Sequence, residues 1–266
     1  MSRKPRFLPL YSWLLIGYLV LPILVMVVYS FNDVVTGIPN VSFTWNGFTT
    51  RWYQHWSDVP GLTASAWLSI RLALAASAAA TVAGTMLALA LVRYSGRRFR
   101  GKAVIDYLMY LNIAAPEIVM GSSLLGLFVT MRIDRGFWTL FLTHVVFSVA
   151  YVIVTVRARL TGFDVRLEEA AADLGSQPLT TFRLVTLPLI LPGVAAGALM
   201  AFALSLDDFV ASDFVSGSIQ PFPVWVYGAT RIGIPPQVFV FGTAIFSLGL
   251  IAAVVSVVLS RRQPAR

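Results

Sequence analysis

Six long apolar segments, separated by short polar connections, make up most of this chain of 266 residues. A helix needs roughly 20 apolar residues to cross a bilayer, and a spanning backbone must satisfy its own hydrogen bonds. Because 58% of the residues are hydrophobic and only 12% are charged, an ordinary soluble domain is excluded. We predict an all-α integral membrane protein with six transmembrane helices. They are Leu10–Phe31, Ala64–Val92, Ile105–Val129, Phe137–Val156, Leu189–Val210 and Val238–Ser260.

The first segment is the only one that a cleaved signal peptide could explain, since it follows a basic start. We predict a retained anchor instead, because the run is long enough to span, contains Pro22 and lacks a small-residue cleavage site. The expected organisation is a single permease domain over residues 1–266. Residues 1–63 form the anchor and an external segment whose Trp and Tyr residues suit the lipid headgroup boundary. Residues 64–260 form a five-helix core.

The basic residues gather on alternate connections between the apolar segments. Fifteen of the 20 Lys and Arg residues lie before the first segment, between the second and third, between the fourth and fifth, or after the sixth. Positive charge in short loops marks the cytoplasmic side of a membrane protein. Both termini and the loop over residues 157–187 are therefore predicted to be cytoplasmic.

That cytoplasmic loop is predicted to form a compact helical knob. Asp164 can cap a short helix, and Glu168 and Glu169 then lie near its positive end. Gly175 ends this helix, and Pro178 starts another. Small side chains at helical spacing leave one face able to approach a partner closely. This face consists of Leu167, Ala170, Ala171 and Leu174.

The same loop carries a spaced motif. Glu169-Ala170-Ala171 is followed after three residues by Gly175, and after eleven further residues by Leu187-Pro188. The motif resembles the loop by which the membrane subunits of ABC importers engage their ATPase; it departs only at Val185, where that family usually has Ile. The resemblance implies a type I ABC importer permease fold. The coupling residues that it implies are Glu168, Glu169, Ala170, Ala171, Leu174, Gly175 and Pro188.

No catalytic, cofactor or metal site is predicted. The chain has no Cys, and its two His residues, His55 and His144, stand alone. The stretch from Gly96 to Ala103 comes close to a phosphate-binding loop, but Ala103 supplies no hydroxyl for Mg²⁺ and the stretch follows a membrane helix. A net charge of +8 is explained by membrane topology, so no nucleic acid partner is expected. We expect His144 to bond between helices.

Acidic residues inside apolar segments are the best guide to what crosses the membrane. A carboxylate at mid-bilayer costs on the order of 2.5–3.5 kcal/mol, so it normally faces a partner or a polar path. Glu117 lies in the third segment, and Asp207 and Asp208 lie near the end of the fifth. The predicted pathway residues are Asp207, Asp208, Ser205, Glu117 and Phe209. The alternative, that these acids only hold helices together, stays open.

Unpaired acids beside aromatic rings suit a cationic, partly aliphatic substrate. The stretches Pro116–Gly121 and Ser205–Val210 resemble the second permease subunit of spermidine/putrescine ABC importers, although Asp213 departs from the expected uncharged residue. The resemblance implies an inner-membrane, non-enzymatic subunit that forms half of a polyamine pathway. Its implied partners are a different six-span permease, two copies of an ATPase, an external polyamine-binding protein and membrane lipid.

The sequence leaves two alternative functions open. The same kind of importer could carry another cargo, such as a different organic cation, an aminophosphonate or chelated iron. An autonomous secondary transporter or channel would also place charges in membrane spans, but it would leave the coupling motif unexplained. Inverted repeats would favour that second alternative, and the sequence shows none.

Overall fold

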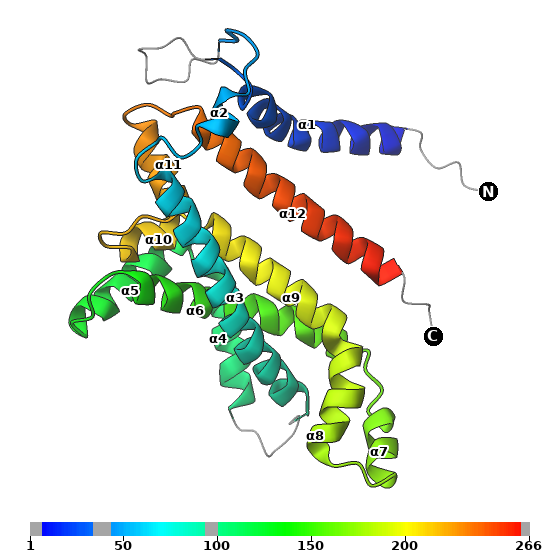
Figure 1. Cartoon of the computed structure of the whole chain (residues 1–266). Coiled ribbons are helices and arrows are strands. Elements are labelled where there is room, and N and C mark those ends of the chain that lie inside the picture. Colours follow the sequence, from blue (N-terminus) through cyan, green and yellow to red (C-terminus); the bar gives the residue numbers. More distant parts are fainter. Residues whose placement is uncertain (1–6, 34–43, 94–100, 262–266) are drawn as a thin grey trace. The chain divides into compact units, whose positions relative to one another are not determined.

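The computed structural model describes residues 7–33, 44–93 and 101–261, and the regular elements within these ranges are all helical (Figure 1). The one bridge between extended residues in these ranges joins Asn32 and Phe48. The all-α class is therefore confirmed. The helices are α1 (Phe7–Tyr29), α2 (Arg51–Gln54), α3 (Leu62–Arg93), α4 (Lys102–Ala114), α5 (Glu117–Thr130), α6 (Phe137–Leu160), α7 (Arg166–Asp173), α8 (Pro178–Thr181), the π-helix η1 (Phe182–Thr186), α9 (Leu187–Asp207), α10 (Val210–Val215), α11 (Phe222–Thr230) and α12 (Gln237–Arg261).

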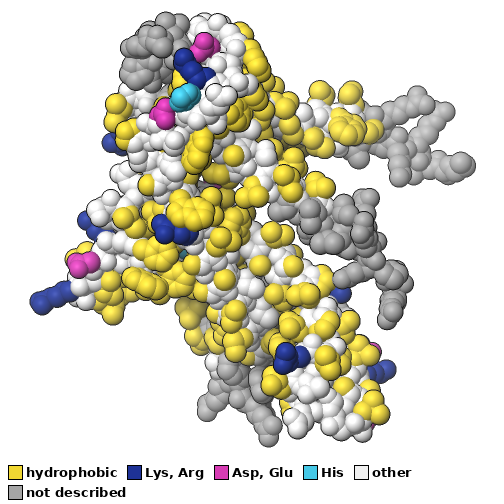
Figure 2. Space-filling model, in the orientation of Figure 1, with side chains coloured by type: hydrophobic (Ala, Val, Ile, Leu, Met, Phe, Trp, Pro, Cys, Tyr) yellow, Lys and Arg dark blue, Asp and Glu magenta, His cyan; other side chains and the backbone are white. Residues whose placement is uncertain are grey.

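Four helical stretches are long and apolar enough to cross a membrane: Pro9–Tyr29, Leu62–Arg93, Phe137–Leu160 and Pro178–Asp207. The pair α4 and α5 makes a fifth if a bent pair counts as one span, and α12 adds a shorter apolar stretch over Gln237–Ile251. Hydrophobic side chains cover much of the visible surface, with charged groups scattered among them (Figure 2). Such a surface suits contact with lipid. The count of six spans and the orientation of the termini stay predictions.

The third predicted segment is not one continuous helix. The chain bends by 113° between α4 and α5, so the single helix predicted over Ile105–Val129 is wrong. Ala115 and Pro116 are both extended, with ψ of 134° and 131°. Proline disfavours helical backbone at the residue before it and has no N–H to donate, which explains the break. Glu117 becomes the first residue of α5 instead of a mid-helix residue.

The fifth predicted segment also ends earlier than expected. Helix α9 stops at Asp207, and Asp208 is extended with ψ of 117°. The predicted helical segment up to Val210 is therefore wrong at its end, because Asp208 lies outside the helix. The short helix α10 follows from Val210.

The contacts divide the chain into two compact units, Trp67–Val224 and Met1–Ala66 with Trp225–Arg266. In the first unit, α6 packs along α9 and α10 packs on α5. Glycines permit these close approaches: a Cβ on Gly193 would lie 2.7 Å from Cβ of Arg159, and one on Gly84 would lie 2.7 Å from Cβ of Val152. Small residues at helix contacts are typical of membrane bundles.

In the second unit, α1 and α2 contact α12. Asn32 is buried and fixes the chain after α1, since its side chain donates to Thr44 O at 2.9 Å and accepts from Asn46 N at 2.9 Å. The rings of Phe31, its neighbour in the sequence, and Phe48, its partner in the bridge, stack at 5.3 Å. Part of the predicted external segment (residues 34–43), the chain termini and most of the rejected phosphate-loop match lie outside the described residues.

Candidate substrate pathway and coupling loop

A cavity of about 240 Å³ opens where the two broken segments of the first unit meet. One wall is the break between α4 and α5, and the opposite wall is the break between α9 and α10. Irregular backbone at membrane depth is tolerated mainly where it lines a cavity. The lining residues are Asn112, Ile113, Ala115, Glu117, Met120, Phe147, Tyr151, Leu204, Asp207, Asp208, Phe209 and Val210.

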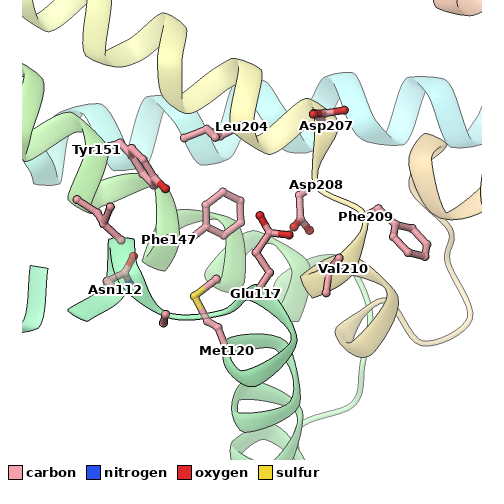
Figure 3. Close-up of a pocket in the computed structure, with 12 residues that line it drawn as sticks. Asn112, Glu117, Met120, Phe147, Tyr151, Leu204, Asp207, Asp208, Phe209 and Val210 are labelled. Carbon is pink, nitrogen blue, oxygen red and sulfur yellow. The ribbon is translucent and has the colours of Figure 1, made fainter. Parts of the chain in front are cut away.

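Four of the five predicted pathway residues line this cavity: Glu117, Asp207, Asp208 and Phe209. Figure 3 shows the Glu117 side chain, from the start of α5, pointing toward Asp208, while Asp207 lies at the end of α9 apart from that pair. Within the described residues the cavity wall contains no Lys or Arg. The aromatic rings of Phe147 and Tyr151 complete the wall from α6. The cavity therefore combines three carboxylates with aromatic and apolar surface.

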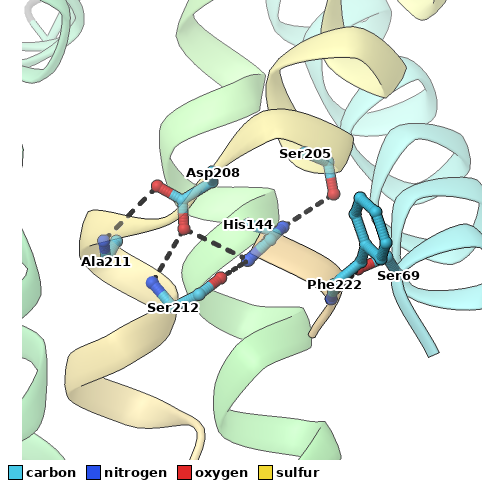
Figure 4. A network of polar contacts seen from close by, with 7 residues as sticks. All are labelled: Ser69, His144, Ser205, Asp208, Ala211, Ser212 and Phe222. Atoms are coloured by element: carbon cyan, nitrogen blue, oxygen red, sulfur yellow. Dashed lines mark hydrogen bonds and ion pairs between the residues drawn. The ribbon is translucent and has the colours of Figure 1, made fainter. Parts of the chain in front are cut away.

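The fifth predicted pathway residue, Ser205, is buried and does not line the cavity. Its Oγ lies 2.7 Å from His144 Nδ1, and the other ring nitrogen of His144 lies 3.0 Å from Ser212 Oγ (Figure 4). The prediction that His144 bonds between helices is thereby confirmed: its ring joins α6 to the end of α9 and to α10.

Asp208 takes part in the same polar network. Its Oδ2 accepts a hydrogen bond from Ser212 N at 2.7 Å and lies 3.6 Å from His144 Nε2. Its Oδ1 lies 3.4 Å from Ala211 N, so the carboxylate caps the first turn of α10. Its side chain is only 8% exposed, whereas Asp207 is exposed. The two adjacent acids thus have different surroundings. Asp213 is also exposed, but it does not line the cavity.

The coupling loop folds as two short helices joined at a glycine, as the sequence predicts. Gly175 has φ of +80°, and the hydrogen bonds Ser176 N to Ala171 O at 3.0 Å and Gly175 N to Ala172 O at 2.8 Å close the end of α7. This pattern is a Schellman motif, which favours glycine because a left-handed residue is needed. The predicted N-cap is wrong by one residue, because Val165 and not Asp164 immediately precedes α7. Asp164 Oδ1 still accepts a hydrogen bond from Arg166 N, the first residue of the helix, at 3.0 Å.

Most of the predicted coupling residues are accessible. Glu169, Ala170, Gly175 and Pro188 are exposed, Ala171 is partly so, and Leu174 is 90% exposed. Glu168 differs, because its Oε1 accepts hydrogen bonds within the chain from Arg93 Nη2 and Thr186 Oγ1. The loop therefore presents an apolar and acidic surface, while Glu168 is bound within the chain and its neighbour Glu169 is exposed.

Several site residues escaped the sequence reasoning. Asn112 and Tyr151 are polar residues within apolar segments, and that signal could have marked them as cavity residues. Arg93 is one of the basic residues between the second and third apolar segments, and nothing in the sequence connects it with Glu168, 75 positions away. The pairing of Arg157 with Asp106, at 2.6 Å, was equally invisible.

Comparison with known proteins decides the class of this chain. Residues 80–263 match the family described as binding-protein-dependent transport system inner membrane component. The chain belongs to this family. It is 40% identical to the spermidine/putrescine transport system permease protein PotC of Escherichia coli K12, over 92% of this chain and 90% of that protein. It is 36% identical to the putrescine transport system permease protein PotI of the same strain, over 95% of this chain and 91% of that protein.

Solved structures support the fold of an importer permease. A chain from the crystal structure of a bacterial ABC transporter involved in the import of the acidic polysaccharide alginate matches with a TM-score of 0.66 at 15% identity. That match covers 100% of this chain and 99% of the other. A chain of the MetNI methionine ABC transporter, in inward-facing conformations, matches with a TM-score of 0.63 at 16% identity, over 76% of this chain and 95% of that one.

Family membership fixes the general role. The chain is a multi-pass inner membrane permease and not an enzyme, as predicted. Permeases of this kind work with a second permease, an ATPase and a binding protein, as the family description and its ABC transporter relatives indicate. An autonomous secondary transporter or channel is excluded, because the family depends on a binding protein.

Proposed function

We propose that this permease belongs to an ATP-driven importer of polyamines and that the cavity beside the two helix breaks is part of the cargo's route. The observation that carries the proposal is the cavity wall: three carboxylates, two of them on opposite sides, with no basic lining residue in the described chain. Protonated amines are attracted to carboxylates, and the methylenes of a polyamine suit the rings and Met120. The names of the PotC and PotI relatives point to the same cargo.

The size and polarity of the cavity support a slender cation. Pockets for drug-sized ligands usually measure about 300–1,000 Å³, so a cavity of about 240 Å³ suits a narrow molecule or a segment of one. Asn112 Oδ1 is buried without a hydrogen-bond partner among the described residues, although its amide donates to Val146 O at 3.2 Å. An ammonium group supplies the donors that this acceptor and the carboxylates need.

The remaining partners follow from the same proposal. A different six-span permease forms the other half of the route as a heterodimer, two copies of an ATPase bind on the cytoplasmic side, and an external polyamine-binding protein delivers the cargo. The exposed motif from Glu169 to Gly175, with Leu174, is the surface that the ATPase contacts. Movement of this loop, driven by ATP, then changes which side of the membrane the cavity faces.

Uptake into proteoliposomes tests the cargo. The complete complex, reconstituted with its binding protein and ATP inside, is expected to accumulate radiolabelled spermidine, with competition from putrescine but not from choline. Asp207→Asn/Asp208→Asn and Glu117→Gln should each lower uptake about tenfold or more, since a hydrogen bond to a charged group contributes about 1.5–3 kcal/mol. Asp213→Asn is the matched control, because Asp213 is an exposed acid of α10 outside the cavity wall.

Two results would contradict the proposal. If the wild-type complex takes up no polyamine, the same machine carries another cargo, and choline, an aminophosphonate and chelated iron are then the substrates to assay. If the double variant transports spermidine at the wild-type rate, the carboxylates of the cavity do not serve the cargo.

A further inference from the structure

Glu168 is the meeting point of three elements that are distant in sequence. Its Oε1 accepts from Arg93 Nη2, at the last residue of α3, and from Thr186 Oγ1, at the last residue of η1. Arg93 Nη2 also lies 3.4 Å from Thr186 Oγ1, so the three side chains close a triangle. Thr186 is fully buried, and the Glu168 side chain is 20% exposed. The triangle therefore lies between the coupling loop and the body of the protein.

The two neighbouring acids of α7 differ in their contacts. Glu168 is bound inside the chain, whereas Glu169 is exposed and has no side-chain hydrogen bond or ion pair within the described part of the chain. The apolar side chains of α7 do not anchor it either, because Leu167 is 47% exposed and the adjoining Leu174 is 90% exposed. The polar triangle is thus a principal attachment of α7 to the membrane helices.

The triangle is placed where movement of α7 can reach the cavity. Thr186 immediately precedes α9, whose 21 residues end at Asp207 in the cavity wall. At 1.5 Å per residue this helix spans about 30 Å. The π-helix η1 inserts an extra residue per turn just below α9, and such turns are frequent at functional sites. Arg93 is the last of the 32 residues of α3, so the triangle is also connected to this long helix.

Stability alone does not explain this arrangement. The Arg93 side chain is 43% exposed, and ion pairs with such exposure contribute little to folding. A three-way contact still fixes geometry, since a guanidinium and a hydroxyl on one carboxylate oxygen hold α3, α7 and η1 in register. A contact that defines geometry with little stability can transmit displacement.

We propose that Arg93 is a positioning residue for energy coupling: by holding Glu168 against Thr186, it transmits displacement of α7 to α3 and α9. The inference rests on the proposed contact between α7 and an ATPase, and it does not depend on the identity of the cargo. In this arrangement Glu169 contacts the ATPase, whereas Glu168 bonds Arg93 and Thr186 within the chain.

The test uses the complete complex in proteoliposomes and three readouts: basal ATP hydrolysis, its stimulation by the binding protein, and spermidine moved per ATP hydrolysed. Arg93→Ala should leave basal hydrolysis intact and lower both stimulation and the transport ratio about tenfold, within the usual range for coupling between sites. Arg93→Lys should keep much of the coupling. Arg93→Glu alone should lose coupling, and Arg93→Glu/Glu168→Arg should regain a large part of it.

Arg157→Ala is the matched control, because it removes another partly buried ion pair, with Asp106 at 2.6 Å, that joins α6 to α4 and does not involve α7. It should leave the transport ratio unchanged. The proposal is overturned if Arg93→Ala couples normally, or if the charge-swapped pair is no better than Arg93→Glu.

The outcomes also separate this inference from the proposed function. Absence of spermidine uptake by the wild type would refute the proposed cargo. The stimulation of ATP hydrolysis by the binding protein would still test the role of Arg93. If Glu169→Lys keeps full stimulation, the proposed ATPase contact at α7 fails, and the inference about Arg93 fails with it.

Discussion

His144 Nε2 lies 3.6 Å from Asp208 Oδ2, and this contact links a fully buried ring on α6 to the carboxylate that caps α10. Asp208 also lines the cavity, so the same carboxylate takes part in the polar network and in the cavity wall. The two adjacent acids therefore differ in how firmly the fold holds them. Asp207 is exposed at the end of α9, and Asp208 is committed to α10 and His144.

Loss of His144 should destabilise the permease. His144→Ala removes both ring contacts, leaving the buried hydroxyls of Ser205 and Ser212 without that partner. An unsatisfied buried polar group costs about 1–3 kcal/mol, so the Tm of the purified complex should fall measurably. His55→Ala is the control, since the His55 side chain is 53% exposed and pairs with Asp58, which is also exposed. Equal Tm values for the two variants would show that the His144 network does not stabilise the fold.

The sequence predicted the long, regular elements well and the breaks poorly. Apolar runs defined α3, α6 and α12 to within a few residues, because burial and lipid contact both favour continuous apolar helices. The 113° bend was missed although Pro116 marks it, since proline is also tolerated within membrane helices. The end of α9 was missed because Asp208 is fixed by Ser212 and His144, and the latter is remote in sequence.

The candidate site was predicted only in part. Carboxylates in apolar segments are unusual enough to identify Glu117, Asp207 and Asp208 without a structure. Local spacing likewise identified the coupling helix and its Gly175 terminus. The tie between Arg93 and Glu168 depends on how α3 ends beside η1, and no local pattern encodes that proximity.

Close packing of α5 on α10 should make Gly121 intolerant of a side chain. A Cβ there would lie 2.8 Å from Phe214 Cδ2 and 3.1 Å from Ala211 Cα. Gly121→Ala should therefore lower stability by about 1–3 kcal/mol, the usual cost of overpacking, and reduce uptake by displacing the cavity wall. Gly126→Ala, on the same helix with nothing within 4 Å, is the control and should behave like wild type. Identical thermal unfolding of both variants would contradict this packing.

The predicted orientation can be measured with topology reporters. Fusions after Arg266 or within the loop at Gly162 should report from the cytoplasm, because basic residues concentrate around these two sites. Insertions near Asn40 or Gly217 should report from outside. An external signal at Gly162 would exclude contact between α7 and a cytoplasmic ATPase. The same reporters test the predicted order of spans, since opposite signals at Asn40 and Gly162, and at Gly217 and Arg266, require an odd number of spans between the members of each pair.

The coupling loop should be dispensable for insertion and required for transport. Gly175→Asp places a charged side chain at φ of +80°, a conformation that disfavours side chains, on a surface proposed to dock closely with the ATPase. We expect normal abundance in the membrane and loss of ATP-dependent spermidine uptake. Gly162→Asp is the matched control, since Gly162 lies in the same loop with open space around it and no positive φ. Wild-type uptake by Gly175→Asp at equal expression would remove the docking role from this helix end.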